Sequence, residues 1–84
     1  MRQEWLRADH STDTHWALFL IFDDHVHVLA VLKNRLIDER MSKPAARAVW
    51  NELRQQGWHH ATDEEVIRHG MSHRRLRDVA YRRR

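Results

Sequence analysis

The segment from Ser42 to Trp58 constrains the fold more than any other, because both of its ends can be predicted. Pro44 suits the first turn of a helix, since its φ angle is already helical and its missing N–H needs no partner there. Ser42 is placed to cap that turn. At the other end, Gly57 can adopt the left-handed conformation that ends a helix. We therefore expect a helix over about residues 43–56.

One face of this helix is apolar and carries a tryptophan. The i, i+3, i+4, i+7 spacing of an amphipathic helix is followed by Ala46, Val49, Trp50 and Leu53. Trp58 follows the helix end, where it would contact Leu53. An isolated helix of this length is marginally stable in water, so its apolar face must pack on other elements. Core packing is the expected role of Trp50 and Trp58, with stacking on a ligand or base as the alternative.

Two apolar segments before the helix predict a β-hairpin over residues 16–32. Trp16 to Phe22 is apolar on both faces, which favours a central strand. His25 to Leu32 is expected to pair with it across a turn at Asp23 and Asp24. The helix would cover one face of the sheet. The other face needs a cover as well, and a second subunit is one candidate.

Shorter segments extend this pattern on either side. Residues 4–6 suggest an edge strand, residues 7–15 a polar loop, and residues 36–41 a third strand. Thr62 and Glu65 match a capping box at the start of a later helix. The sequence thus predicts an α+β fold. A small antiparallel sheet of two to four strands is packed by one amphipathic helix and followed by one or two short C-terminal helices.

Charge is distributed unevenly along the chain. Residues 72–84 hold six arginines and one acid, Asp78, for a net charge of +5, whereas the other 71 residues hold nine Lys/Arg and eleven Asp/Glu and carry −2. We therefore divide the chain into a small α+β domain, residues 1–70, and a basic segment, residues 71–84. The basic segment is either a docked helix or a tail that orders only on binding. Such asymmetry indicates an anionic partner for that segment.

The candidate binding residues lie in the basic segment and are Arg74, Arg75, Arg77, Tyr81, Arg82, Arg83 and Arg84. Arginine binds phosphate through two parallel hydrogen bonds, and a tyrosine can stack on a base. Nucleic acid is the preferred partner, and an acidic protein surface is the second. The third interpretation is a charged end that only aids solubility. If the basic segment binds an anionic partner, deleting residues 72–84 should abolish binding and leave the body folded.

A different function is association through the apolar sheet, either as a homodimer or by docking on a larger assembly. A chain of 84 residues buries only ~60–65% of its unfolded surface, so association would add useful stability. The two functions are compatible, because a dimer would double the charge of the basic segment.

Metal binding and catalysis have less support in the sequence. His25 and His27 lie two apart on a predicted strand, so their rings would share a face and could bind Zn²⁺ or Ni²⁺ with a third ligand. No histidine spacing matches a structural zinc motif, and surface histidines are the expected interpretation. The serines lack a nucleophile-elbow context, and the two glycines are placed to end helices. We expect a non-enzymatic protein with no cofactor and no catalytic residue.

Composition also indicates where the protein works. Cysteine is absent, which excludes disulfides and fits a reducing compartment. The first ten residues are polar, unlike a signal peptide. The longest apolar run, residues 16–22, is much shorter than the ~20 residues that a membrane span requires. We expect a soluble, cytoplasmic protein with no membrane partner.

The pattern Ala46, Trp50, Leu53 and Gly57-Trp58 resembles the end of a family of very small cyanobacterial proteins of unknown function. That family begins with a Trp-Leu pair, here at residues 5–6, and continues through strands and a basic turn to a helix ending in Gly-Trp. The resemblance covers residues 4–60. The turn at residues 33–35 lacks the family's arginine-rich run, and the extension after His60 is not part of the pattern. The resemblance implies a cyanobacterial or cyanophage setting and no catalytic residue.

Overall fold

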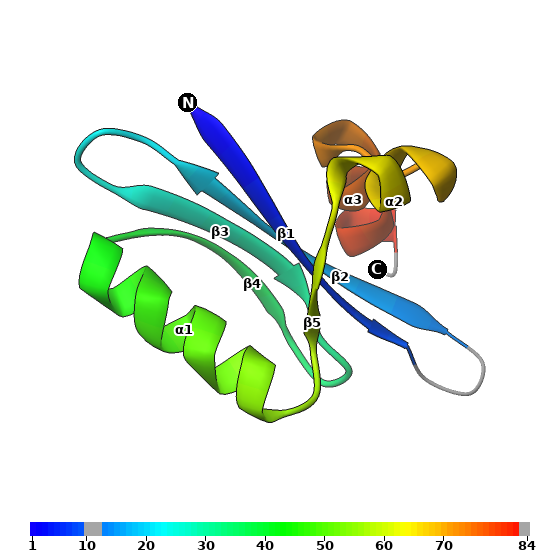
Figure 1. Cartoon of the computed structure of the whole chain (residues 1–84), viewed down its shortest axis with the longest axis horizontal. Coiled ribbons are helices and arrows are strands. Elements are labelled where there is room, and N and C mark those ends of the chain that lie inside the picture. Colours follow the sequence, from blue (N-terminus) through cyan, green and yellow to red (C-terminus); the bar gives the residue numbers. More distant parts are fainter. Residues whose placement is uncertain (10–12, 83–84) are drawn as a thin grey trace.

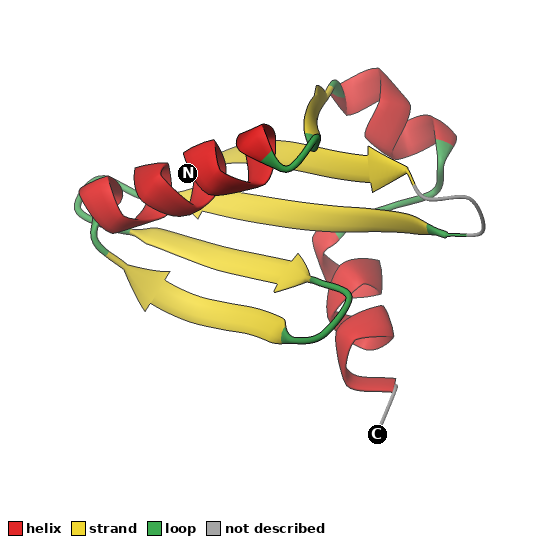
Figure 2. Ribbon diagram, turned by 90° about the horizontal axis from the view of Figure 1, so that it is seen from below, coloured by secondary structure: helices red, strands yellow, loops and turns green. Residues whose placement is uncertain are grey.

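The computed structural model describes residues 1–9 and 13–82, which form a five-stranded antiparallel sheet with helices on both faces (Figures 1 and 2). In chain order, the elements are β1 (Arg2–Asp9), β2 (Thr14–Ile21), β3 (Val26–Val31), β4 (Leu36–Met41), α1 (Lys43–Gln55), β5 (His59–Ala61), α2 (Asp63–Arg68) and α3 (His73–Arg82). The strand order across the sheet is β4-β3-β2-β1-β5. The predicted α+β class is confirmed, whereas the predicted number of strands, two to four, is wrong.

β2 is the central strand of the sheet, as its two apolar faces predict. It pairs with β3 in the expected hairpin and with β1 on its other side. Successive side chains of a strand point to opposite faces. Ala17 and Phe19 therefore belong to the hydrophobic cluster on one face, and Leu18 and Leu20 to the cluster on the other. All four are buried, so both faces of the sheet need cover.

α1 covers the first face, and both of its predicted ends are confirmed. The Ser42 hydroxyl caps the first turn by accepting a hydrogen bond of 3.2 Å from the Ala45 N–H. Gly57 has a φ of +98°, and this left-handed conformation lets the Trp58 N–H donate to the Leu53 carbonyl at 3.0 Å. The helix runs over residues 43–55, one residue shorter than predicted. Trp58 is buried in the core on this face, as expected.

Gly57→Ala is expected to lower the free energy of unfolding by about 1–2 kcal/mol, because a Cβ is strained in the left-handed region. No atom outside Gly57 and its two chain neighbours lies within 4 Å of the added Cβ, so the cost is one of backbone conformation and not of a clash. Urea denaturation measures it. Gln56→Ala, at the exposed neighbouring position, is the control and should change stability by less than about 0.5 kcal/mol. Equal effects of the two substitutions would contradict this reasoning.

α2 and α3 cover the second face of the sheet (Figure 2). Leu76 and Ala80 of α3 are buried in the same cluster as Trp16 of β2. Ser72 caps α3, because its hydroxyl accepts a hydrogen bond of 3.1 Å from the Arg75 N–H. Up to residue 82, the basic segment is thus a docked helix, and no second subunit is needed to cover this face. None of the helices in the described residues combines the length and apolarity that crossing a lipid bilayer requires.

α2 is fixed to β1 by a charged contact. The Thr62 hydroxyl accepts a hydrogen bond of 3.2 Å from the Glu65 N–H, which forms half of the predicted capping box. The Glu65 carboxylate accepts a hydrogen bond of 3.1 Å from the Arg7 guanidinium. That guanidinium also lies over the Trp16 ring, 5.7 Å from its centroid. The contact joins the first turn of α2 to β1.

β1 and β5 differ from the sequence-based expectation. β1 is eight residues long and includes residues 7–9, which were predicted as loop. It is not an edge strand, because the short strand β5 pairs with its outer side. The paired residues are Trp5 with Ala61, Leu6 with His60 and Arg7 with His59. β5 has no apolar alternation of its own, so only this long-range pairing makes it a strand.

Candidate nucleic-acid interface

The predicted binding residues of α3 lie on two different sides of the helix. Its exposed arginines are Arg74, Arg75 and Arg82. Arg77 and Tyr81, which lie one turn apart, reach the sheet instead and contact β4. Arg83 and Arg84 lie outside the described residues. We call Arg74, Arg75 and Arg82 the outer arginines, and they share the exposed side of the helix with a single acid, Asp78.

Asp38 of β4 is the partner of the inward-reaching residues. Its Oδ2 accepts hydrogen bonds from Arg77 Nη1, at 2.9 Å, and from the Tyr81 hydroxyl. Its Oδ1 lies 2.5 Å from Nε2 of His27, on β3. Arg77 Nη2 lies 3.4 Å from Nε2 of His73. Two of the predicted binding residues therefore serve to join α3 to the sheet.

The same network changes the titration of Asp38. Burial by itself would raise the pKa of this carboxyl, but hydrogen bonds from Tyr81, His27 and Arg77, together with the Arg77 charge, lower the pKa to about 2. The pKa of His73 is lowered as well, first by burial and then by the positive charge of Arg77. The fold therefore favours the ionised form of Asp38 and the neutral form of His73.

We expect the network to be lost in acid. The folded-state pKa of Asp38 lies below its ordinary value of 3.8, so its contribution is present above about pH 4 and disappears as pH falls toward 2. Protonation of His73 adds to the loss, because its charged form is disfavoured in the fold. Loss of the Asp38 contribution should lower the free energy of unfolding by about 1–2 kcal/mol in acid. This is less than the pKa shift alone would give, because water screens part of the network.

Urea denaturation at about pH 7 and about pH 3 tests this expectation. Asp38→Asn should lower stability at neutral pH and reduce the difference between the two pH values. Asp78→Asn, which removes an exposed acid of the same helix, should keep the wild-type difference. A full wild-type pH dependence in the Asp38→Asn variant would show that another group is responsible.

The two histidines considered for metal binding are held by different carboxylates. His27 contacts Asp38, whereas His25 Nδ1 lies 2.6 Å from Oδ1 of Asp24 and its ring stacks on Phe22 at 4.6 Å between centroids. The hydrogen bond with His25 is the main reason why the pKa of Asp24 is lowered. In residues 1–9 and 13–82, no group of three or more His, Asp or Glu side chains is placed to hold a metal ion.

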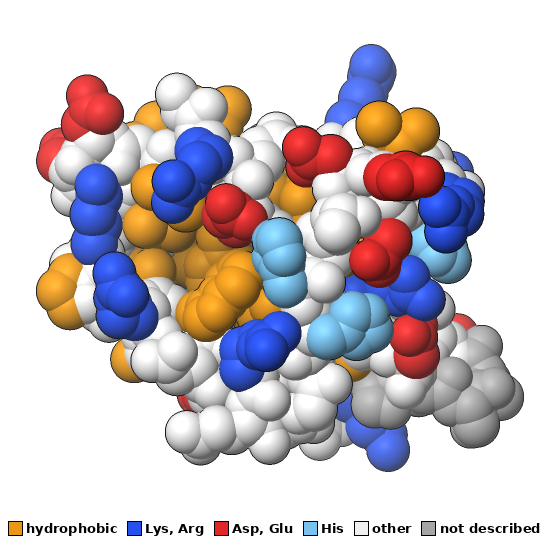
Figure 3. All heavy atoms as spheres, viewed as in Figure 1, with side chains coloured by type: hydrophobic (Ala, Val, Ile, Leu, Met, Phe, Trp, Pro, Cys, Tyr) orange, Lys and Arg blue, Asp and Glu red, His pale blue; other side chains and the backbone are white. Residues whose placement is uncertain are grey.

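A groove on the opposite face of the sheet was not anticipated. It has a volume of about 570 Å³ and lies between α1 and the first half of β1. Figure 3 shows it as a patch of apolar side chains bordered by positive, negative and histidine side chains. Its floor is formed by Phe19, Ile21, Val26 and Trp50, and its positive rim by Arg2, Lys43 and Arg47. The i, i+4 spacing of Lys43 and Arg47, one turn before Trp50, is the only signal of it in the sequence.

Comparisons with protein-family models, with curated proteins and with solved structures found no match to this chain. The resemblance to small cyanobacterial proteins thus rests on the residues quoted for it. The two charged surfaces, the outer arginines of α3 and the rim of the groove, lie on opposite faces of the sheet.

Proposed function

We propose that this is a small non-enzymatic binding protein that contacts an anionic partner, in the first place nucleic acid, through the outer arginines of α3. One observation carries the proposal: Leu76 and Ala80 are buried against the sheet. The outer arginines are therefore presented by a docked helix and not by a loose tail. A preorganised helix loses less conformational freedom when it binds, so more of the electrostatic attraction appears as affinity.

The spacing of the outer arginines suits a polyanion. Arg75 and Arg82 are separated by about 11 Å along the helix axis, at 1.5 Å per residue. Duplex DNA carries one negative charge per about 1.7 Å, so this length faces several phosphates. Arg77 is excluded from the contact, because it is paired with Asp38 at 2.9 Å. The contacts we propose are to phosphate, which gives affinity without sequence preference.

Electrophoretic mobility of random-sequence single-stranded RNA and duplex DNA tests the proposal. We expect the full chain to bind both at about 50 mM salt and clearly less at about 200 mM. If it binds neither at the lower concentration, the nucleic-acid proposal is wrong. A pull-down from lysate with and without nuclease then separates the two partners, because retention that survives nuclease would indicate an acidic protein surface instead.

Point substitutions are the appropriate variants for this test. Removing residues 72–84 would also remove Leu76, which is 1% exposed and belongs to the core, so the truncated body should not remain intact. We use instead a variant in which the outer arginines are replaced, Arg74→Gln, Arg75→Gln and Arg82→Gln, and call it the triple-glutamine variant. These side chains are exposed, so the fold should be retained.

Association through the apolar sheet is the alternative function. The fold leaves less apolar sheet surface open for association than the sequence suggested, because α1 packs on one face of the sheet and α2 and α3 pack on the other. We therefore expect light scattering to find a monomer. A dimer that persists on dilution would favour the alternative, and it would be probed further by substitutions on the exposed faces of the helices.

A further inference from the structure

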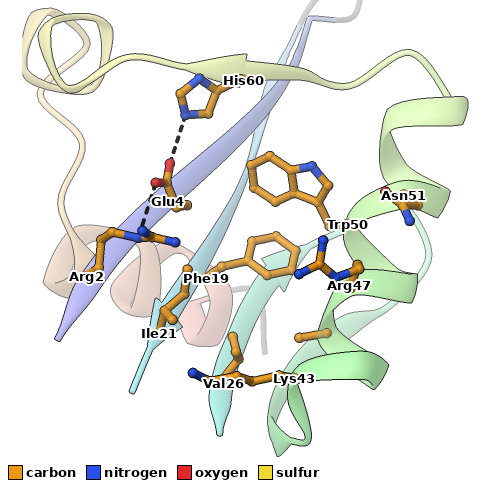
Figure 4. Close-up of a pocket in the computed structure, with 11 residues that line it drawn as sticks. Arg2, Glu4, Phe19, Ile21, Val26, Lys43, Arg47, Trp50, Asn51 and His60 are labelled. Atoms are coloured by element: carbon orange, nitrogen blue, oxygen red, sulfur yellow. Dashed lines mark hydrogen bonds and ion pairs between the residues drawn. The ribbon is translucent and has the colours of Figure 1, made fainter. Parts of the chain in front are cut away.

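Trp50, in the floor of the groove, is only partly buried. Trp50 packs edge-on against Phe19, with 5.1 Å between ring centroids and 75° between the ring planes. Phe19 is itself buried, so it contacts Trp50 from the side of the core. Figure 4 shows the indole extending from α1 toward β1, next to Phe19. The three other tryptophans, Trp5, Trp16 and Trp58, are buried in the core. Of the four tryptophans, Trp50 is thus the one left partly exposed, and its ring centroid lies 6.0 Å from that of His60.

The rim of the groove is positive and only partly neutralised. Within the described residues, neither Lys43 nor Arg47 makes an ion pair, and their i, i+4 spacing puts both side chains on the same side of α1. Across the floor, Arg2 contacts Glu4 at 3.5 Å, and His60 lies 2.9 Å from the other oxygen of Glu4 (Figure 4). The single acid of the rim is therefore already engaged by β1 and β5, whereas the cations of α1 are available to a ligand.

We infer that the groove binds a nucleoside monophosphate. The base would lie against Trp50, because stacking on an aromatic ring is favourable for any base. The phosphate would contact Lys43 and Arg47, whose cationic hydrogen-bond donors match its charge. Asn51 lines the same groove and offers both a donor and an acceptor to the edge of the base. A volume of about 570 Å³ falls within the range of ordinary small-molecule sites.

This site is independent of the proposed polyanion surface. Its residues come from α1, β1, β2, β3 and β5, and they belong to the face of the sheet opposite α3. The aromatic floor and the cationic rim together match a ligand with a ring and an anion in one molecule. Neither inorganic phosphate nor an uncharged nucleoside meets both conditions.

Heteronuclear NMR of the full chain tests the inference, with adenosine 5′-monophosphate, adenosine and inorganic phosphate as separate probes. The monophosphate should shift the indole N–H signal of Trp50 and leave those of Trp5 and Trp16, on the other face, unchanged. We expect saturation below about 1 mM and at least tenfold weaker binding of adenosine, since losing one charge-assisted contact costs about a factor of ten. Equal binding of adenosine, or the absence of any shift at Trp50, would overturn the inference.

A matched pair of variants locates the phosphate. Lys43→Gln with Arg47→Gln should weaken monophosphate binding at least about tenfold. Lys33→Gln with Arg35→Gln removes the same two side-chain types from the exposed β3–β4 turn and should leave binding within about twofold. The triple-glutamine variant should bind the monophosphate normally, so this inference and the proposed function can fail separately. Equal weakening by both double variants would reduce the effect to net charge and contradict the site.

Discussion

Replacing Leu76 with alanine is expected to lower the free energy of unfolding by about 2–5 kcal/mol. Leu76 is 1% exposed and lies in the cluster that contains Trp5, Trp16 and Leu29. Leu76 and the much smaller Ala80 are the two buried residues of α3. The substitution removes apolar surface and leaves a cavity, and the aromatic neighbours are too well packed to close it.

Urea denaturation of Leu76→Ala and of Arg74→Ala gives the comparison. Arg74 is exposed on the other side of the same helix, so its replacement should cost less than about 0.5 kcal/mol. Amide hydrogen exchange adds a local readout, because the N–H groups of α3 should lose protection before those of β2 and β3. A cost below about 1 kcal/mol for Leu76→Ala would mean that α3 is not anchored as we describe.

The triple-glutamine variant is expected to bind nucleic acid about 100-fold more weakly than the wild type at low salt, if each arginine contributes about 1 kcal/mol. Glutamine keeps much of the side chain and removes the charge, so the effect isolates electrostatics. The fold should be unchanged, because the buried side of α3 is untouched. Fluorescence anisotropy with a labelled random RNA measures the affinity directly.

The control for this prediction removes three positive charges elsewhere on the surface. Its substitutions are Lys33→Gln, Arg35→Gln and Arg54→Gln, all at exposed positions. Net charge then falls equally in both variants. If the control loses as much affinity as the triple-glutamine variant, binding responds to total charge and α3 is not the contact surface.

Local chemistry made part of the fold predictable. Ser42 and Gly57 determine the ends of α1 through their own side-chain and backbone properties, and the structure places both ends within a residue of the prediction. β2 was recognised as central because both of its faces are apolar. These features depend on residues close together in the chain, so the sequence pattern contains the relevant interactions.

The features that sequence analysis missed depend on distant partners. β5 is a strand because residues 59–61 pair with residues 5–7. Arg77 and Tyr81 were grouped with the binding arginines, but Asp38, which lies 39 and 43 positions earlier, turns them inward. The groove joins β1, α1 and β5. The i, i+4 spacing of Lys43 and Arg47 indicates only the α1 part of its rim, and the partial exposure of Trp50 does not follow from helical periodicity. Only the folded arrangement brings these groups together.

The salt dependence of nucleic-acid binding tests the central claim most directly, because the slope of log K against log salt counts the phosphates neutralised. If the outer arginines contact three phosphates, the slope for the triple-glutamine variant should be shallower than that of the wild type by about 2–3. The charge-matched control should keep the wild-type slope. Identical slopes for the wild type and the triple-glutamine variant would contradict the claim that the outer side of α3 is where this protein meets its anionic partner.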